Sequence, residues 1–149
     1  MRRSAIEWAL TAVVVAGLAI DAYVHLHVAG DYRLVRTSVV SQATLFRIEG
    51  TVAALAALWV LLRASLWSAL AAFLVAAGGV GALTFYYYVD PGRLGPLPDM
   101  YEPVWFADKT WTFDGSAAAA VAALLLAISL VVGSRRRLTG GRCCAARRP

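Results

Sequence analysis

The residues most able to do chemistry lie near the end of the first apolar segment, in the stretch IDAYVHLHVAGDY (residues 20–32). Asp21 and His25 are four residues apart and share one face of a helix. Glu49 follows in TLFRIEG, at the start of the next apolar segment. Carboxylate and imidazole groups suit Zn²⁺ or another divalent transition metal. Asp21, His25 and Glu49 therefore form a candidate site for a metal ion or a small polar ligand.

Spacing decides which neighbouring residues can join this site. His25 and His27 are two residues apart, which turns them to opposite sides of a helix, so His27 is expected to lie outside the site. Arg47 and Glu49 are separated in the same way. A buried carboxylate in a membrane costs roughly 2.5–3.5 kcal/mol on insertion scales and usually has a partner. A structural role for Asp21, either in an ion pair with Arg47 or in a hydrogen bond with His25, is therefore the alternative to a ligand site.

The composition places these residues in a membrane protein. The chain has 149 residues, of which 60% are hydrophobic and 15% are charged, whereas soluble domains are about one quarter charged. Four segments approach the roughly 20 residues that span a bilayer. The first is too long for the apolar part of a signal peptide and is expected to be retained. We expect an all-α integral membrane bundle of four antiparallel helices over residues 1–134, with helices at residues 5–28, 45–62, 66–89 and 115–133.

The basic residues predict how the chain crosses the membrane. With four spans, nine arginines share one side: Arg2, Arg3, Arg63, Arg135, Arg136, Arg137, Arg142, Arg147 and Arg148. The loop at residues 90–114, on the other side, has five acids and only two basic residues. Positive charge favours the cytoplasmic side. Both termini are therefore expected to be cytoplasmic in the plasma (inner) membrane of a bacterium, with the Asp21 region in the outer leaflet.

Short sequence features predict the contacts between helices. The turn at residues 63–65 is so short that the second and third helices must be antiparallel neighbours. Glycines at positions 78, 79 and 81 are expected to let another backbone approach closely, although they could also bend the helix. Asp114 is placed to cap the start of the fourth helix.

The loop at residues 90–114 is rich in proline and aromatic residues. Its prolines prevent long regular structure. Trp and Tyr favour the headgroup region of a membrane, so the loop is expected to lie across the outer ends of the helices. A lid over a pocket is the alternative.

Other functions find little support. The basic residues flank the membrane spans, and no groove-reading helix or stacking surface accompanies them, so nucleic-acid binding is not expected. No nucleophile and base pair, and no cofactor fingerprint, is visible. The tail at residues 135–149 is predicted to be disordered and to bind anionic lipid headgroups. Cys143 and Cys144 lie in this tail and are expected to be reduced, because the cytoplasm is a reducing compartment.

The stretches AYVHLHVAGDY, ATLFRIEG and GPLPDMYEPVWFADKTW carry a resemblance to a known group. The chain resembles the small four-helix membrane proteins of unknown function found in GC-rich actinobacteria. It is also similar in layout, without a shared sequence motif, to DoxX-like proteins. Neither resemblance assigns a role to any residue.

The sequence therefore predicts a non-enzymatic membrane protein without an obligatory cofactor. A structural or accessory subunit, with a membrane-protein partner or as a homo-oligomer, is the first interpretation. The alternative is a protein that binds a divalent metal or small ligand near Asp21, His25 and Glu49, in a site that opens outward. The third is an oligomeric transporter of protons or small molecules.

Overall fold

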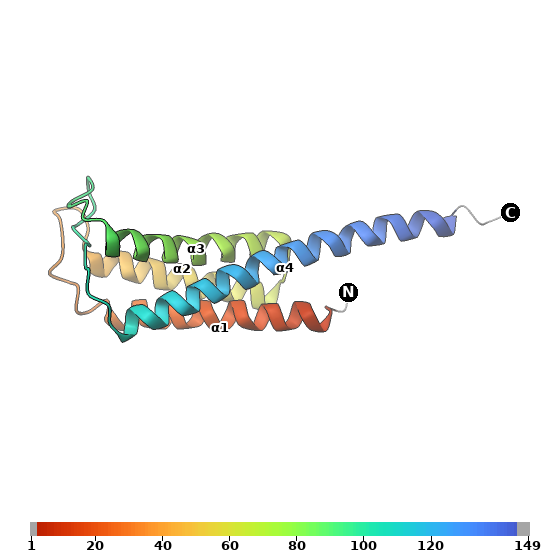
Figure 1. Ribbon diagram of the computed structural model, residues 1–149, viewed down its shortest axis with the longest axis horizontal. Helices are drawn as coiled ribbons and strands as arrows, with labels where there is room; N and C mark the ends of the chain where they lie inside the picture. The colour runs from red at the N-terminus through yellow and green to blue at the C-terminus, as the bar shows by residue number, and fades with distance from the viewer. Residues whose placement is uncertain (1–2, 146–149) are drawn as a thin grey trace.

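The computed structural model describes the backbone of residues 3–145 and the side chains of residues 3–134. This part of the chain is all-helical (Figure 1), with α1 (Ala5–Val28), α2 (Gln42–Leu62), α3 (Leu66–Tyr88) and α4 (Ala107–Ala145). All four helices are long and apolar enough to cross a membrane, α4 over Ala107–Ser134. The expected all-α architecture with four such helices is confirmed.

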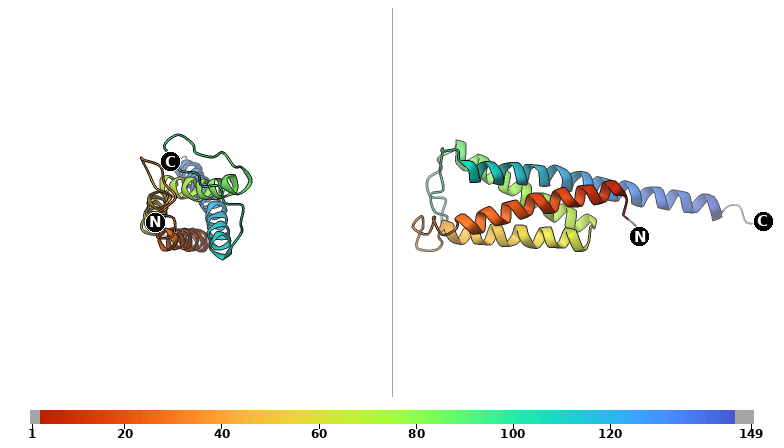
Figure 2. Two further views of the ribbon diagram at one scale, coloured as in Figure 1. Left: turned by 90° about the vertical axis from the view of Figure 1, so that its left-hand side faces the viewer. Right: turned by 90° about the horizontal axis from the view of Figure 1, so that it is seen from below.

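The helices form a closed ring in chain order. α1 packs against α2 and α4, and α3 packs against the same two helices. The end-on view in Figure 2 shows them roughly at the corners of a square. Both ends of the chain lie at one end of the bundle, and α4 extends beyond it (Figure 1). The segments 29–41 and 89–106 cover the opposite end, which is called the loop end below.

Serine residues define where three helices begin. The Ser4 side chain accepts a hydrogen bond from the Glu7 backbone N–H, and the Glu7 carboxylate accepts one from Ser4 N–H at 2.8 Å. Ser65 and Ser68 form the equivalent reciprocal cap on α3. Ser41 caps α2. Such caps satisfy backbone donors that have no partner within the helix, which gives the acid at position 7 a local structural role.

The start of α4 differs from the sequence prediction. The helix begins at Ala107, so Asp114 is not its N-cap but lies exposed about two turns inside it. Pro103 is the last helix breaker in this region, and the residues from Ala107 to Asp114 include neither proline nor glycine. The backbone also stays helical to Ala145, where disorder was predicted from residue 135. The rest of the predicted tail, 146–149, lies outside the described residues.

Small residues let the helices pack closely. The buried core is mostly alanine, together with larger residues such as Val14, Leu18 and Leu126. The closest approach joins α1 and α4. A Cβ atom on Gly17 would overlap the Gly115 carbonyl oxygen and lie 2.9 Å from the Ala119 Cβ atom. Membrane helices commonly use small residues in this way, since they bring two backbones into contact.

The glycines expected to make such contacts are not the ones that do. A Cβ atom at Gly78 or Gly81 would have no heavy atom within 4 Å, and α3 continues through both without a break. Gly50, on α2, is close to α1 instead, since a Cβ atom there would lie 3.0 Å from the Ala22 carbonyl oxygen. Glycine runs are conspicuous in sequence, but which glycines meet another helix depends on their position around the helix.

The α1–α4 contact predicts different results for two Gly→Ala changes. Gly17→Ala should destabilise the bundle by about 1–3 kcal/mol, because the added methyl group forces the two backbones apart. Gly81→Ala should be neutral or slightly stabilising, since its methyl group meets nothing and alanine is the better helix former. Unfolding in detergent would measure both changes. An equal loss of stability in the two variants would contradict the close contact at Gly17.

Candidate functional site

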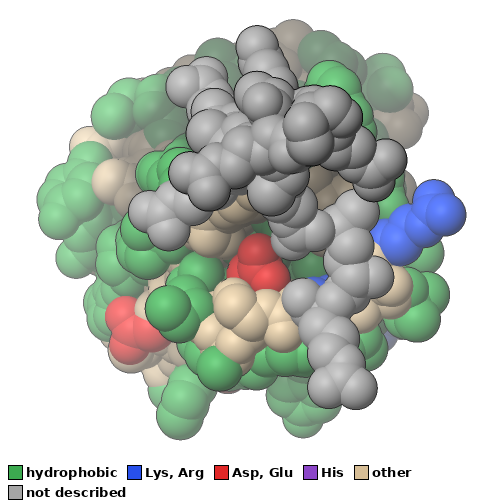
Figure 3. Space-filling view, turned by 90° about the vertical axis from the view of Figure 1, so that its right-hand side faces the viewer, with side chains coloured by type: hydrophobic (Ala, Val, Ile, Leu, Met, Phe, Trp, Pro, Cys, Tyr) green, Lys and Arg blue, Asp and Glu red, His purple; other side chains and the backbone are tan. Residues whose placement is uncertain are grey.

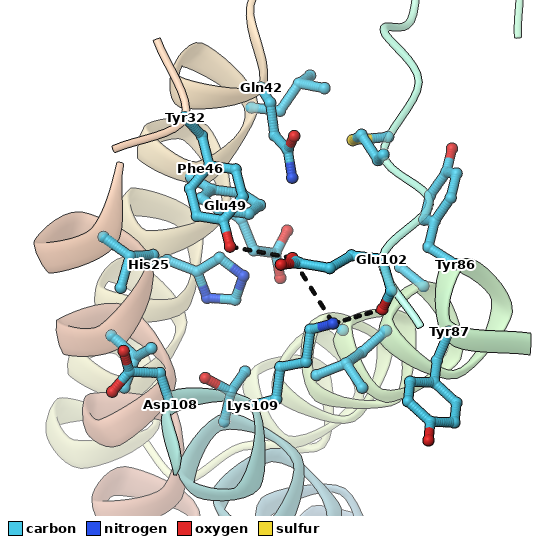
Figure 4. A pocket seen from close by; sticks show the side chains of 18 of the residues that line it. His25, Tyr32, Gln42, Phe46, Glu49, Tyr86, Tyr87, Glu102, Asp108 and Lys109 are labelled. Carbon is cyan, nitrogen blue, oxygen red and sulfur yellow. Dashed lines mark hydrogen bonds and ion pairs between the residues drawn. The ribbon is translucent and has the colours of Figure 1, made fainter. Parts of the chain in front are cut away.

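A cavity of about 490 Å³ lies at the loop end, between the four helices and beneath the segment 89–106 (Figure 4). Its surface is mostly apolar. The side chains with polar groups that line it are His25, Tyr32, Gln42, Glu49, Tyr86, Tyr87, Glu102, Asp108, Lys109 and Thr112. Cavities of a few hundred cubic ångströms with apolar walls and few polar groups are typical of small-molecule sites.

Aromatic rings form part of the cavity wall. The Phe46 ring lies edge-on to His25, with centroids 5.2 Å apart, and its centroid is 5.0 Å from that of Tyr32. Tyr87 on α3 packs edge-on against Trp105 of the covering segment at 5.2 Å. Edge-to-face pairs at these distances are favourable, because the positive ring edge meets a negative ring face. The aromatic residues therefore join the covering segment to the helices, as a lid would require.

Glu102 holds the covering segment over the cavity. Its Oε2 accepts a hydrogen bond from the Tyr32 hydroxyl at 3.0 Å and lies 3.6 Å from Lys109 Nζ. Its backbone N–H donates to the Tyr86 carbonyl oxygen at 3.2 Å. Lys109 also donates to the carbonyl oxygens of Glu102 and Val104, at 2.6 and 2.7 Å. The ammonium of Lys109 thus has three oxygen partners.

The pKa of Tyr32 is raised in this position. Partial burial, followed by the hydrogen bond to the Glu102 carboxylate, raises the pKa of Tyr32 from 10.0 to about 12. Both effects favour the neutral phenol. The stabilising contact is therefore complete below pH 10.0 and is lost as the pH rises through about 12. Near neutral pH, Tyr32 remains a hydrogen-bond donor to the covering segment.

Asp21 is buried just below the cavity and has two partners. Its side chain is 1% exposed, and Oδ1 accepts a hydrogen bond from the Ser116 hydroxyl at 3.0 Å. The Nδ1 atom of His25 lies 3.3 Å from the same carboxylate oxygen and 3.0 Å from the Asp21 carbonyl oxygen. Both oxygens accept, so the proton of the imidazole belongs on Nδ1. Asp21 therefore joins α1 to α4.

The structure does not form the expected ion pair between Asp21 and Arg47. Among residues 3–134 the ion pairs join His25 to Asp21 and Lys109 to Glu102. Arg47 is exposed on α2, because Glu49, two positions further on, is the one that turns inward. His27 is likewise exposed and stacks on Tyr23, whereas His25 lines the cavity.

Glu49 differs from Asp21 because its buried carboxylate oxygen has no hydrogen-bond partner. Its Oε1 atom is buried and makes no hydrogen bond. Gly79 on α3 provides the space in front of it, because a Cβ atom there would lie 3.7 Å from Glu49 Oε1, 3.8 Å from Ser116 Oγ and 3.9 Å from Asp21 Oδ1. These four residues are called the acidic niche below. A buried polar atom without a partner is costly and therefore calls for a ligand or water.

The three predicted metal ligands meet at this end of the bundle, but not as a ligand set. In the part of the chain whose side chains are described, no group of three or more His, Cys, Asp or Glu side chains could hold a metal ion. The His25 Nδ1 atom, which faces Asp21, carries a proton in the arrangement above, and the Asp21 oxygen is already occupied by Ser116. The chemistry available is hydrogen bonding and charge pairing.

Several site residues escaped the sequence analysis. Ser116 is the one hydroxyl residue in the run DGSAAAA, and that isolated hydroxyl was a usable signal. Tyr32, Glu102 and Lys109 gave no comparable signal, since their contacts join segments up to 70 positions apart. Gly79 was expected as a packing residue or as a point where the helix could bend. The residues that complete the site are therefore mainly those that depend on tertiary structure.

The contacts of Asp21 predict the outcome of two double-mutant cycles. Asp21→Ala and Ser116→Ala should be coupled by about 1 kcal/mol, as expected for a hydrogen bond between membrane helices. Asp21→Ala and Arg47→Ala should be additive within about 0.5 kcal/mol, since the two side chains do not interact. Unfolding of the single and double variants in detergent measures both. If Asp21→Ala were coupled to Arg47→Ala and additive with Ser116→Ala, the partner of Asp21 would be Arg47 and not Ser116.

Comparison of the chain with known protein families, with curated proteins and with solved structures finds no match. No residue role is therefore transferred from another protein. The resemblance to small actinobacterial four-helix proteins, and to DoxX-like proteins in layout, stays a prediction. The roles proposed below depend on the contacts of this chain.

Proposed function

We propose that this chain is a multi-pass protein of the bacterial plasma membrane that binds a small, mostly apolar molecule in its loop-end cavity. One observation carries the proposal: a cavity of about 490 Å³ contains a buried carboxylate oxygen of Glu49 without a partner. This favours the ligand-binding interpretation over a purely structural or accessory subunit. The accessory role and the transporter role stay predictions.

The outer surface supports insertion in a bilayer. Large apolar side chains are strongly exposed on every helix, for example Ile6, Leu62, Leu74 and Val121 at 61–69%. In the end-on view of Figure 3, hydrophobic side chains surround the bundle. Soluble monomers rarely expose continuous apolar surfaces of this extent, whereas a surface in contact with lipid requires them.

The charges support an orientation with the loop end outside the cell. Arg63, in the turn between α2 and α3, is at the same end of the bundle as the two termini. The arginines near the termini add to the positive charge at that end of the sequence. Because positive charge is retained on the cytoplasmic side, the cavity opens toward the outer face of the membrane.

This orientation predicts the accessibility of the two cysteines, Cys143 and Cys144, which are the chain's only thiols. A membrane-impermeant maleimide should label them after cells are opened and leave them unlabelled in intact cells. A variant with both changed to serine and one cysteine introduced at exposed Ser38 is the control, and it should label in intact cells. Labelling of the native cysteines from outside would reverse the orientation.

Ligand binding is tested with two matched variants of α3. Gly79 lines the cavity, whereas Gly81 is exposed and outside its lining. Three probes with the same ring and different charge are used: 2-phenylethylamine, 2-phenylethanol and phenylacetate. At least one should bind saturably to the wild-type protein and to Gly81→Leu in lipid nanodiscs, and each probe that binds should bind more weakly to Gly79→Leu, whose side chain takes up part of the cavity.

Isothermal titration calorimetry measures this binding, with protein-free nanodiscs as the blank. The unfolding temperature without probe shows whether each variant is folded. If none of the three probes binds the wild-type protein, or if Gly79→Leu binds as well as Gly81→Leu, the proposed function is wrong.

A further inference from the structure

We infer that the ligand of the loop-end cavity is an organic amine whose ammonium group is bound by Glu49 and whose apolar part lies between the aromatic walls. This inference rests on the proposed function and specifies the class of ligand. It follows from which polar groups in the cavity already have partners, from the space beside Glu49 and from the nature of the walls.

The basic groups of the cavity are already engaged by protein oxygens. Lys109 Nζ contacts two carbonyl oxygens and the Glu102 carboxylate. The His25 Nδ1 atom is held by the carboxylate and the carbonyl oxygen of Asp21. With its proton on Nδ1, His25 presents Nε2 as an acceptor, so a ligand anion would have to compete with existing partners for the donors of both residues. It would also meet the carboxylates of Glu49, Glu102 and Asp108, which all line the cavity.

Unlike the donors of Lys109 and His25, the buried Oε1 atom of Glu49 is unused, because it is an acceptor that receives no hydrogen bond. The acidic niche surrounds this atom. A Cβ atom at position 79 would lie within 4 Å of a carboxylate oxygen of Glu49, a carboxylate oxygen of Asp21 and the Ser116 hydroxyl. Ser116 donates its hydroxyl proton to Asp21 and cannot serve Glu49 with the same proton. An ammonium group has only donors and a positive charge, so it complements this niche in both respects.

The walls favour a cation with an apolar body over a hydrated ion. The surface is mostly apolar, and the rings of Phe46, Tyr86, Tyr87 and Phe106 face the cavity. Lys109 shows that these rings accept a cation, because its Nζ atom lies 4.9 Å from the Phe106 ring centre and 5.9 Å from that of Tyr87. A metal ion is the poorer choice, since the described side chains contain no set of three suitable ligands.

The same three probes separate this inference from the proposed function. Near neutral pH, 2-phenylethylamine should bind the wild-type protein about tenfold tighter than 2-phenylethanol, because both can donate a hydrogen bond to Glu49 but only the amine adds a positive charge. Phenylacetate should bind most weakly. Zwitterionic lipid is used in the nanodiscs, so that the charge of the bilayer does not concentrate the amine.

Glu49→Gln should remove the preference for the amine and leave the affinity for 2-phenylethanol unchanged, since the side chain keeps its shape and loses its charge. Asp31→Asn is the matched control, because it removes one exposed negative charge at the same end but outside the cavity lining. It should keep the preference. Gly79→Ala is the second variant. Its methyl group would lie in ordinary contact with Glu49 Oε1, at 3.7 Å, where the ammonium group is expected. This change should therefore weaken the binding of the amine more than the binding of the alcohol.

The outcomes are distinct. If the alcohol or phenylacetate binds tightest to the wild-type protein, or if Glu49→Gln and Gly79→Ala both keep the preference for the amine, the inference is wrong and ligand binding stands. If no probe binds the wild-type protein, the proposed function fails and the inference fails with it.

Discussion

The close approach of α1 and α4 at Gly17 and Gly115 is the constraint on which the site depends. No side chain separates the two backbones there, so the next residue of α4, Ser116, is brought within 3.0 Å of the Asp21 carboxylate, one turn beyond Gly17. A wider spacing would leave Asp21, which is 1% exposed, without that donor. Packing and polar pairing therefore depend on each other at this contact. The bundle accommodates a buried acid because two glycines let its partner reach it.

This contact also explains why Asp21 has polar partners and Glu49 does not. Asp21 lies on the α1–α4 interface, where Ser116 and His25 surround it. Glu49 enters from α2 and faces α3, whose residue at the nearest point is glycine and provides no donor. A polar group that is buried without a partner opposes folding, and a well-satisfied one does not. The unpaired carboxylate of Glu49 therefore lowers the stability of the fold, and residues that lower stability in this way are expected in binding sites.

The sequence predicted the elements of this fold better than their contacts. Hydrophobic length is a local signal, and the predicted first helix has the bounds of α1. The spacing of two residues correctly separated His25 from His27, because helix geometry fixes their directions. The choice of Arg47 as the partner of Asp21 failed because it was made from charge alone. Only the packing of α1 on α4 brings the Ser116 hydroxyl to Asp21. The contacts that hold the covering segment join residues far apart in the sequence, so no local pattern predicts them.

The single lysine of the chain shows how the covering segment and the cavity are linked. Lysine has a compact ammonium with three donors, whereas arginine has a planar group that suits paired acceptors. At position 109 the three donors meet two carbonyl oxygens and one carboxylate of the covering segment, so the charge is used to hold that segment in place. Because Lys109 is bound by oxygens of the covering segment, that segment is held over the cavity and the buried Glu49 oxygen keeps no basic partner.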